Sequence, residues 1–198
     1  MPYTPQHKQR TRERILDSAR RLFNSRGFAD VSIAEVMDDA GLTHGGFYRH
    51  FRDKDELYAA AVRRFLCAEA PKPWRGSRRP TGKGPAGKGR AARLVDAYFS
   101  RDHFDDRETC CPLIALPSDV ARQGRAVRDA YQDVLEKLLD LLRDDLAGPQ
   151  ARERALSVVA LCVGGMVAAR SVSDPALAHD LRRAAYRQAR SVLKAQPC

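Results

Sequence analysis

The chain has 198 residues, a hydrophobic fraction of 43% and a formal net charge of +10 at pH 7. This length suits a small domain joined to a larger one, with enough apolar side chains for real cores. The mean hydropathy of −0.49 and the lack of an apolar run near 20 residues predict that no segment enters a membrane. The N-terminus has no signal-peptide pattern and the five cysteines are an odd number, so we expect a cytoplasmic protein without a disulfide framework.

Positive charge is concentrated in the first 29 residues, where seven Lys or Arg side chains stand against Glu13 and Asp17. A basic region suits a polyanion such as DNA, whose phosphates attract cations irrespective of sequence. The alternative is a solvated helix face, and charge alone does not separate the two.

Apolar residues at helical spacing predict a first helix that begins near residues 5–8 and ends at Gly27; they are Ile15, Leu16, Ala19, Leu22 and Phe23. Ser32 and Glu35 have the spacing of a capping box, which marks the start of a second helix. A turn over residues 40–42 follows, in which Gly41 is free to take a positive φ.

A third, short helix is expected over residues 43–51, with Thr43 as its N-cap. Phe47 and Phe51 are four residues apart and should face the first two helices. Asp53 and Glu56 form another capping-box pattern, which opens a fourth helix running to about residue 70. Two short helices joined by a glycine turn are typical of a helix-turn-helix.

The exposed face of the third helix is unusual because Gly45 and Gly46 stand side by side in it. Glycine in a helix interior costs roughly 0.5–1 kcal/mol relative to alanine. A close approach of DNA would offset this loss, because the second helix of a helix-turn-helix enters the major groove with its N-terminal residues on the bases.

The stretch "SIAEVMDDAGLTHGGFYRHFRDKDELYAAAV" resembles the DNA-binding domain of TetR-family transcriptional regulators of the AcrR-like kind, and "RERILDSARRLFNSRGF" resembles their first helix. The resemblance spans roughly residues 8–65. It implies a homodimer in which a three-helix DNA-binding domain is joined by a fourth helix to a larger helical domain for ligand binding and dimerisation. It also implies repression relieved by a small-molecule effector.

Carried over to this sequence, the resemblance places Thr43, His44, Gly45 and Gly46 closest to the bases. It assigns phosphate contacts to Tyr48, His50 and Lys54, and a backbone contact to Ser32. Arg49 is a candidate for a bidentate contact with guanine, worth about 1–3 kcal/mol of discrimination. A purely structural role is the alternative for Tyr48, His50 and Lys54.

Beyond the fourth helix, residues 71–89 contain four Pro, five Gly, six Lys or Arg and no acid, which predicts a disordered loop. Helical patterns resume over residues 90–99, 113–120, 124–146, 151–172 and 174–194. We therefore predict an all-α protein with a DNA-binding domain at residues 1–52 and a ligand-binding and dimerisation domain at residues 53–198.

"TCCPLIALPSDVARQGRAVRDAY" resembles a TetR subgroup in which Cys-Pro-Leu begins a helix beside the ligand cavity. One relative there senses electrophiles, so Cys110 and Cys111 are candidate sensors of an electrophilic effector; burial as small hydrophobic residues is the alternative. The other candidates for the cavity are apolar or aromatic, although such a set is often simple core: Tyr98, Phe99, Leu113, Leu116, Tyr131 and Met166. His103 with the two cysteines matches no closed zinc spacing, so no metal is expected.

The last two helices are expected to form the dimer interface, because the resemblance implies a four-helix bundle from two subunits. Four residues allow a partner helix to approach closely: Cys162, Gly164, Gly165 and Ala168. No nucleophile with a placed base, metalloprotease motif or phosphate-binding loop is present, so we predict neither an enzyme nor a cofactor. The rival interpretation is an architectural or nonspecific DNA-binding protein that responds to no thiol reagent.

Overall fold

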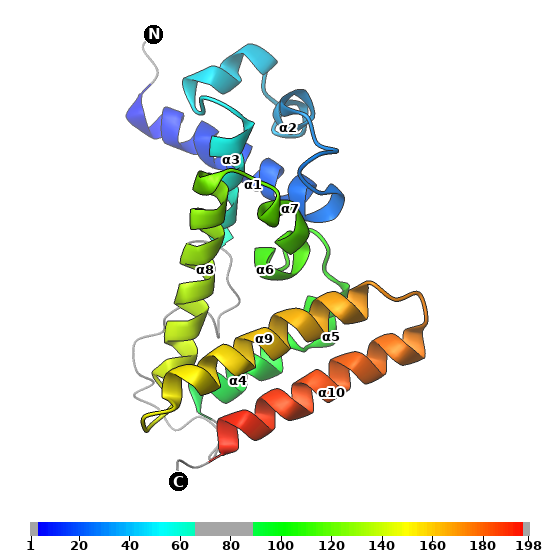
Figure 1. Ribbon diagram of the computed structural model, residues 1–198. Coiled ribbons are helices and arrows are strands. Elements are labelled where there is room, and N and C mark those ends of the chain that lie inside the picture. The colour runs from blue at the N-terminus through cyan, green and yellow to red at the C-terminus, as the bar shows by residue number, and fades with distance from the viewer. Residues whose placement is uncertain (1–3, 66–88, 196–198) are drawn as a thin grey trace. The chain divides into compact units, whose positions relative to one another are not determined.

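The computed structural model describes residues 4–65 and 89–195, and every regular element within these ranges is a helix (Figure 1). The all-α prediction is therefore confirmed for the described residues. Apart from Gly89, the loop predicted at residues 71–89 lies outside them, as does the end of the fourth helix. None of the described helices is both long and apolar enough to cross a membrane.

Contacts divide the described residues into two compact units. The first comprises residues 4–65 and 107–134, and the second comprises residues 89–106 and 135–195. The functional division at residue 52 stays a prediction, because compactness groups residues by contact and not by what they bind.

The first unit opens with α1 (Pro5–Arg26), which begins where the side chain of Thr4 accepts the His7 N–H and ends at Gly27, whose φ is +84°. Its buried stripe includes Ile15, Ala19 and Phe23, as the sequence predicts. The capping box of α2 (Ile33–Asp39) is present with both of its hydrogen bonds. Gly41 turns the chain with a φ of +64°.

The third helix is a 3₁₀-helix, η1 (His44–Arg49), rather than an α-helix. Its bonds span three residues, from the Gly46 N–H to the Thr43 carbonyl (2.9 Å) and from the His50 N–H to the Phe47 carbonyl (2.8 Å). The tighter 3₁₀ form is common in short pieces of chain. Thr43 is the N-cap, but its side chain makes no capping hydrogen bond, so that part of the prediction is wrong.

The next helix of this unit is α3 (Lys54–Arg64). Only half of its predicted capping box forms: the Asp53 carboxylate accepts the Glu56 N–H at 2.7 Å, whereas the Glu56 carboxylate accepts the Arg52 N–H at 2.9 Å. The short helices α6 (Pro112–Ala115) and α7 (Pro117–Ala121) follow later in the chain, each starting with a proline. The first part of α8 (Arg125–Arg143) completes the unit.

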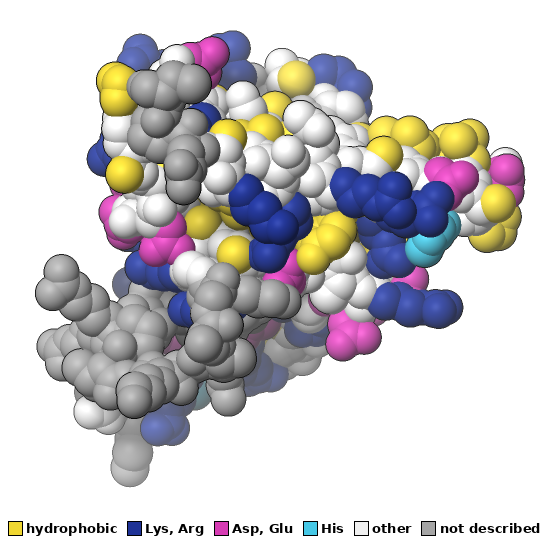
Figure 2. Space-filling model, turned by 90° about the horizontal axis from the view of Figure 1, so that it is seen from below, with side chains coloured by type: hydrophobic (Ala, Val, Ile, Leu, Met, Phe, Trp, Pro, Cys, Tyr) yellow, Lys and Arg dark blue, Asp and Glu magenta, His cyan; other side chains and the backbone are white. Residues whose placement is uncertain are grey.

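The second unit contains α4 (Arg90–Tyr98), α5 (Arg101–Asp105), the remainder of α8, α9 (Ala151–Arg170) and α10 (Pro175–Lys194). The helices α9 and α10 form an antiparallel pair (Figure 1). Asp174 caps α10 by accepting the Ala176 N–H at 2.9 Å, as predicted. Apolar and basic side chains lie beside each other on the surface seen from the side of α10 (Figure 2), and the exposed fractions of Leu156 and Leu177 are 42% and 47%.

Candidate nucleic-acid interface

The segment from Thr43 to Arg49 separates its side chains into two faces. Phe47 is fully buried, and Phe51 just beyond the segment is 2% exposed, which confirms that both belong to the core. Tyr48 is 61% exposed, and Thr43, His44 and Arg49 are exposed as well. The segment therefore presents a polar face supported from behind by two phenylalanine rings.

Gly45 lies on the open part of this face. A Cβ at position 45 would meet no atom within 4 Å, and the φ of Gly45 is not in the left-handed region. At Gly46 an added Cβ would stand at ordinary contact distances, 3.6 Å from Met37 Cε and 3.8 Å from Thr43 Oγ1. Space and backbone conformation within the described residues thus do not require a glycine at position 45.

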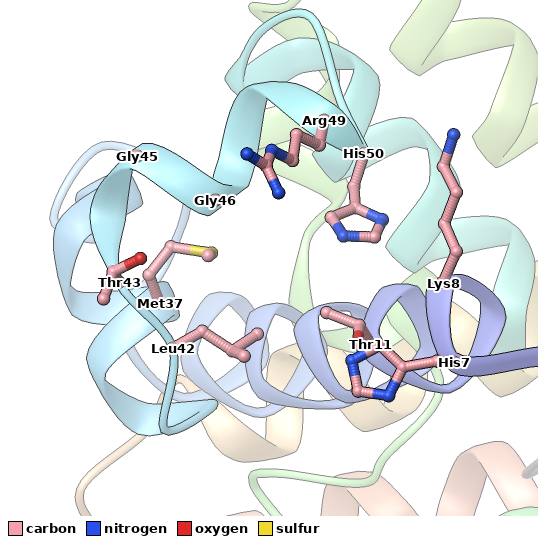
Figure 3. Close-up of a pocket in the computed structure, with 10 residues that line it drawn as sticks. All are labelled: His7, Lys8, Thr11, Met37, Leu42, Thr43, Gly45, Gly46, Arg49 and His50. Carbon is pink, nitrogen blue, oxygen red and sulfur yellow. The ribbon is translucent and has the colours of Figure 1, made fainter. Parts of the chain in front are cut away.

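A hollow of about 750 Å³ lies between this segment and the N-terminal part of α1 (Figure 3). Figure 3 shows one wall from η1 and the turn before it, and an opposite wall from α1. The residues lining the hollow are His7, Lys8, Thr11, Met37, Leu42, Thr43, Gly45, Gly46, Arg49 and His50. The motif predicts the η1 wall but not the contribution of His7, Lys8 and Thr11, because only the fold brings α1 there.

The pKa of His50 reflects the burial and the positive charge of this hollow. Burial lowers its pKa, and the nearby cations Lys8, Arg12 and Arg49 lower it further. Its Nδ1 is buried and makes no hydrogen bond within the described residues. An anion placed in the hollow would meet Lys8 and Arg49, which line it, and would favour the charged form of the imidazole.

Lys54 is only partly available to an external anion. Its Nζ donates a hydrogen bond to the Phe28 carbonyl and lies over the Phe28 ring, 4.1 Å from the centroid. Burial lowers the pKa of Lys54. The side chain predicted to bind phosphate is therefore held by the turn between α1 and α2.

Ser32 caps α2 from an exposed position. Its hydroxyl donates to Glu35 Oε2 at 2.8 Å and accepts the Glu35 N–H at 3.2 Å. The Ser32 N–H donates to Glu35 Oε2 as well, at 2.8 Å, and this bond, the bond from the Ser32 hydroxyl and Arg26 together lower the pKa of Glu35 to about 2. A phosphate contact from the Ser32 hydroxyl would compete with Glu35 for its only proton.

The residues predicted to line a ligand cavity are divided between the two units. Tyr98, Phe99 and Met166 are buried in the second unit. The first unit holds the remaining five: Cys110, Cys111, Leu113, Leu116 and Tyr131. The side chains of both cysteines are fully buried, and burial, together with the nearby Cys111, raises the pKa of Tyr131 to about 12.

The four residues predicted for dimerisation point to different sides of α9. Cys162 is buried within the chain, and Gly165 lies against Ala185 of α10. Gly164 and Ala168 are exposed. Among the described residues, no group of three or more His, Cys, Asp or Glu side chains is arranged to hold a metal ion.

The comparison with known protein families finds a match in the N-terminal part of the chain. The model of the bacterial regulatory proteins of the tetR family matches residues 15–61. The chain is 45% identical over 56 residues to the HTH-type transcriptional regulator AcrR of Shigella flexneri, which covers 28% of this chain and 26% of that protein. It is 32% identical over 137 residues to the uncharacterized HTH-type transcriptional regulator YerO of Bacillus subtilis, 68% of this chain and 45% of that protein. The chain thus spans less than half the length of these curated relatives.

Solved structures resemble the chain over most of its length. The reduced form of NemR from E. coli has a TM-score of 0.68 at 17% identity and covers 92% of this chain and 96% of NemR. A TetR-family transcriptional regulator from Streptomyces coelicolor has a TM-score of 0.66 at 23% identity, with 94% and 95% covered. Likeness at these identities shows a shared fold. The sequence matches, with the family model at residues 15–61 and with the two regulators, show that the chain belongs to the TetR family of bacterial regulatory proteins.

Proposed function

We propose that this protein is a sequence-specific DNA-binding regulator of transcription that inserts the segment Thr43–Arg49 into the major groove. The observation that carries the proposal is the open face at Gly45, beside a hollow with cationic walls. Neither space nor φ requires a glycine at this position, whereas a closely approaching duplex leaves no room for a side chain.

The proposed contacts are of two kinds, those with base edges and those with phosphates. Thr43, His44, Gly45 and Gly46 face the base edges, and Arg49 is long enough to reach a guanine. Tyr48 and His50 donate to phosphates, as does Lys54. The hollow adds Lys8 and Thr11 of α1 as further phosphate donors, since both line the same space.

A palindromic operator requires two copies of the chain. We place the homodimer contact on the exposed face of α9, where small or apolar residues recur every four positions: Leu156, Ala160, Gly164 and Ala168. A partner helix can approach such a face closely. Cys162 and Gly165 support this surface from within, because they pack inside the chain.

Release from DNA is proposed to begin in the segment that contains Cys110 and Cys111. The Asn24 side chain donates to the Glu108 carbonyl at 2.9 Å and to the Cys110 carbonyl at 3.0 Å, which ties this segment to α1. A small-molecule ligand that displaces the segment would release the repressor if it bound the displaced state more tightly. Modification of either buried thiol would act in the same way, because an added group has to displace its neighbours.

The test is fluorescence anisotropy on a duplex selected by the wild-type protein from a random library, with a random duplex of equal length as the comparison. We expect tight binding to the selected duplex and a large loss for Arg49→Ala on that duplex alone. Equal affinity for both duplexes would instead establish the architectural alternative. Treatment with a thiol-reactive electrophile should release the wild type but not the Cys110→Ser/Cys111→Ser variant; release of both would exclude these two cysteines as the reactive groups, and release of neither would leave only the noncovalent ligand.

A further inference from the structure

We infer that Asp119 is a positioning residue for DNA binding, which acts through the main chain of Phe28 to hold Lys54 in place for a phosphate. This inference rests on the proposed function and adds a route by which residues 108–121 set operator affinity. Asp119 lies in α7, 65 positions beyond Lys54 in the chain, and nothing in the DNA-binding motif points to it.

The first link is the hydrogen bond between Asp119 Oδ2 and the Phe28 N–H, 2.9 Å long. Gly27 makes this approach possible: a Cβ at position 27 would lie 3.0 Å from the same oxygen, and its φ of +84° favours glycine. The Asp119 side chain is 19% exposed, so the bond is largely shielded from water. The turn after α1 is thus fixed from α7.

The second link runs from Phe28 to Lys54. The Phe28 carbonyl accepts a hydrogen bond from Lys54 Nζ, and the Phe28 ring lies under the same ammonium. That ring is itself held by Tyr58, with centroids 4.7 Å apart, and by Phe23 at 5.8 Å. An ammonium has three N–H donors, so the bond to Phe28 leaves two for a phosphate.

Both links hold Lys54 before DNA arrives. A lysine side chain carries about 2 kcal/mol of rotamer entropy, and a carbonyl that fixes it in advance reduces the loss on binding. The charge of Asp119 also favours the charged form of Lys54 and opposes the effect of burial on its pKa. Removing Asp119 therefore loosens the turn that orients the ammonium.

The third link ties α7 to the proposed release mechanism. Residues 108–110 are bound to α1 through the side chains of Arg20 and Asn24, the former at 3.1 Å from the Glu108 carbonyl. A displacement that begins at Cys110 reaches Asp119 within nine residues. Because the two equilibria are linked, a ligand that breaks the hydrogen bond between Asp119 and Phe28 lowers the affinity for the operator. Operator binding in turn stabilises that hydrogen bond by the same factor.

The experiment is a double-mutant cycle on the selected duplex, measured by anisotropy at several salt concentrations. Asp119→Ala should weaken binding about three- to tenfold, the value of one lost hydrogen bond. In a Lys54→Met background the same change should alter affinity less than twofold. Equal effects of Asp119→Ala in both backgrounds would overturn the inference.

Two matched variants separate the hydrogen bond from a merely structural role. Asp119→Asn keeps an oxygen that accepts the Phe28 N–H and should bind within about twofold of wild type. Arg122→Ala removes the exposed partner of Asp119, 2.9 Å from its other oxygen, and should also leave affinity unchanged. If Arg122→Ala matched Asp119→Ala, the ion pair would be the cause and the proposed route would be wrong.

The salt dependence provides a readout that simple destabilisation does not move. Loss of the Lys54 phosphate contact should lower the slope of log affinity against log salt by about 0.9, and Asp119→Ala should lower it by part of that amount. Hydrogen exchange of residues 107–121 should slow when the selected duplex binds the wild type but not the Lys54→Met variant. Unchanged exchange in the wild type would contradict the coupling. A wild type with no preference for its selected duplex would refute the proposed function instead.

Discussion

Gly165 and Ala185 lie so close together that a Cβ at position 165 would stand 2.3 Å from the Ala185 Cβ. Two carbon atoms that are not bonded to each other cannot approach this closely, so α9 and α10 would have to move apart. We predict that Gly165→Ala lowers the free energy of unfolding by about 1–3 kcal/mol. Gly124 is the control: a Cβ at position 124 would meet nothing within 4 Å, so Gly124→Ala should be neutral or stabilising in the same urea titration. Equal losses for the two variants would contradict the packing.

The exposed side of α9 gives a prediction about assembly. Ala168→Glu introduces a charge on the proposed dimer face, next to the exposed Gly164. An unpaired charge buried at an interface is costly, so sedimentation should show a shift from dimer to monomer. Ala126→Glu, the same change at an exposed position of α8, serves as the control. A dimer that survives Ala168→Glu would exclude this face.

A substitution at Gly45 should affect DNA binding without affecting the stability of the fold. Because an added Cβ has open space, Gly45→Ala should leave the thermal midpoint unchanged or raise it slightly. Affinity for the selected duplex should fall at least about tenfold, since a methyl group would meet the bases at close approach, a difference of about 1.4 kcal/mol. Gly124→Ala is matched, because it too has open space. Undiminished DNA binding by Gly45→Ala would remove the observation on which the proposed function depends.

His50 should make DNA binding depend on pH. Its pKa is lowered in the free protein by burial and by Lys8, Arg12 and Arg49, so the imidazole is mostly neutral at pH 7. A phosphate favours the imidazolium, which raises the pKa in the complex; binding then takes up a proton and tightens as the pH falls. We expect about a two- to fivefold gain in affinity from pH 7.5 to pH 6. His50→Gln should abolish this gain, and a gain that persists in His50→Gln would contradict the prediction.

Arg170 should be a major source of stability in the second unit. Its guanidinium donates to the carbonyls of His103 (2.6 Å), Asp106 (2.8 Å) and Phe104 (3.1 Å), which close the C-terminal end of α5. A lysine cannot reproduce this fork, so Arg170→Lys should lower the free energy of unfolding by about 1–3 kcal/mol. Urea titration measures the loss. The exposed Arg187 of α10 is the control, and an equal loss for Arg187→Lys would show that these bonds contribute little.

Local sequence signals were sufficient for the long helices and for the position of the recognition segment. The Ser32–Glu35 spacing and the stripe at Ile15 and Phe23 encode structure within a few residues, and the fold follows them. The five-residue helix α5 is too short to show a stripe of apolar residues, and Arg170, which closes its C-terminal end, is distant in the sequence. The sequence also does not predict the 3₁₀ form of η1, because capping patterns do not distinguish a 3₁₀-helix from an α-helix.

The candidate site was predicted only as far as the motif reaches. Sequence spacing identifies the exposed side chains from Thr43 to Arg49, but the α1 wall at His7, Lys8 and Thr11 depends on how α1 packs. Helical spacing also did not show that Gly165 faces Ala185 rather than solvent, because α9 is apolar on most of its circumference. The engagement of Lys54 by Phe28 likewise arises from a contact between separate elements.

The tether between α1 and residues 108–110 uses side chains on one partner and main-chain carbonyls on the other. Arg20 and Asn24 recognise the carbonyls of residues 108 and 110, which every amino acid provides. Substitution at residue 108, whose side chain is exposed, can therefore change the chemistry of the sensing segment while the attachment persists. Such an arrangement lets a regulator acquire new stimuli during evolution without rebuilding the link to its DNA-binding helices. Deep mutational scanning should accordingly find the exposed residue 108 more tolerant of substitution than Asn24.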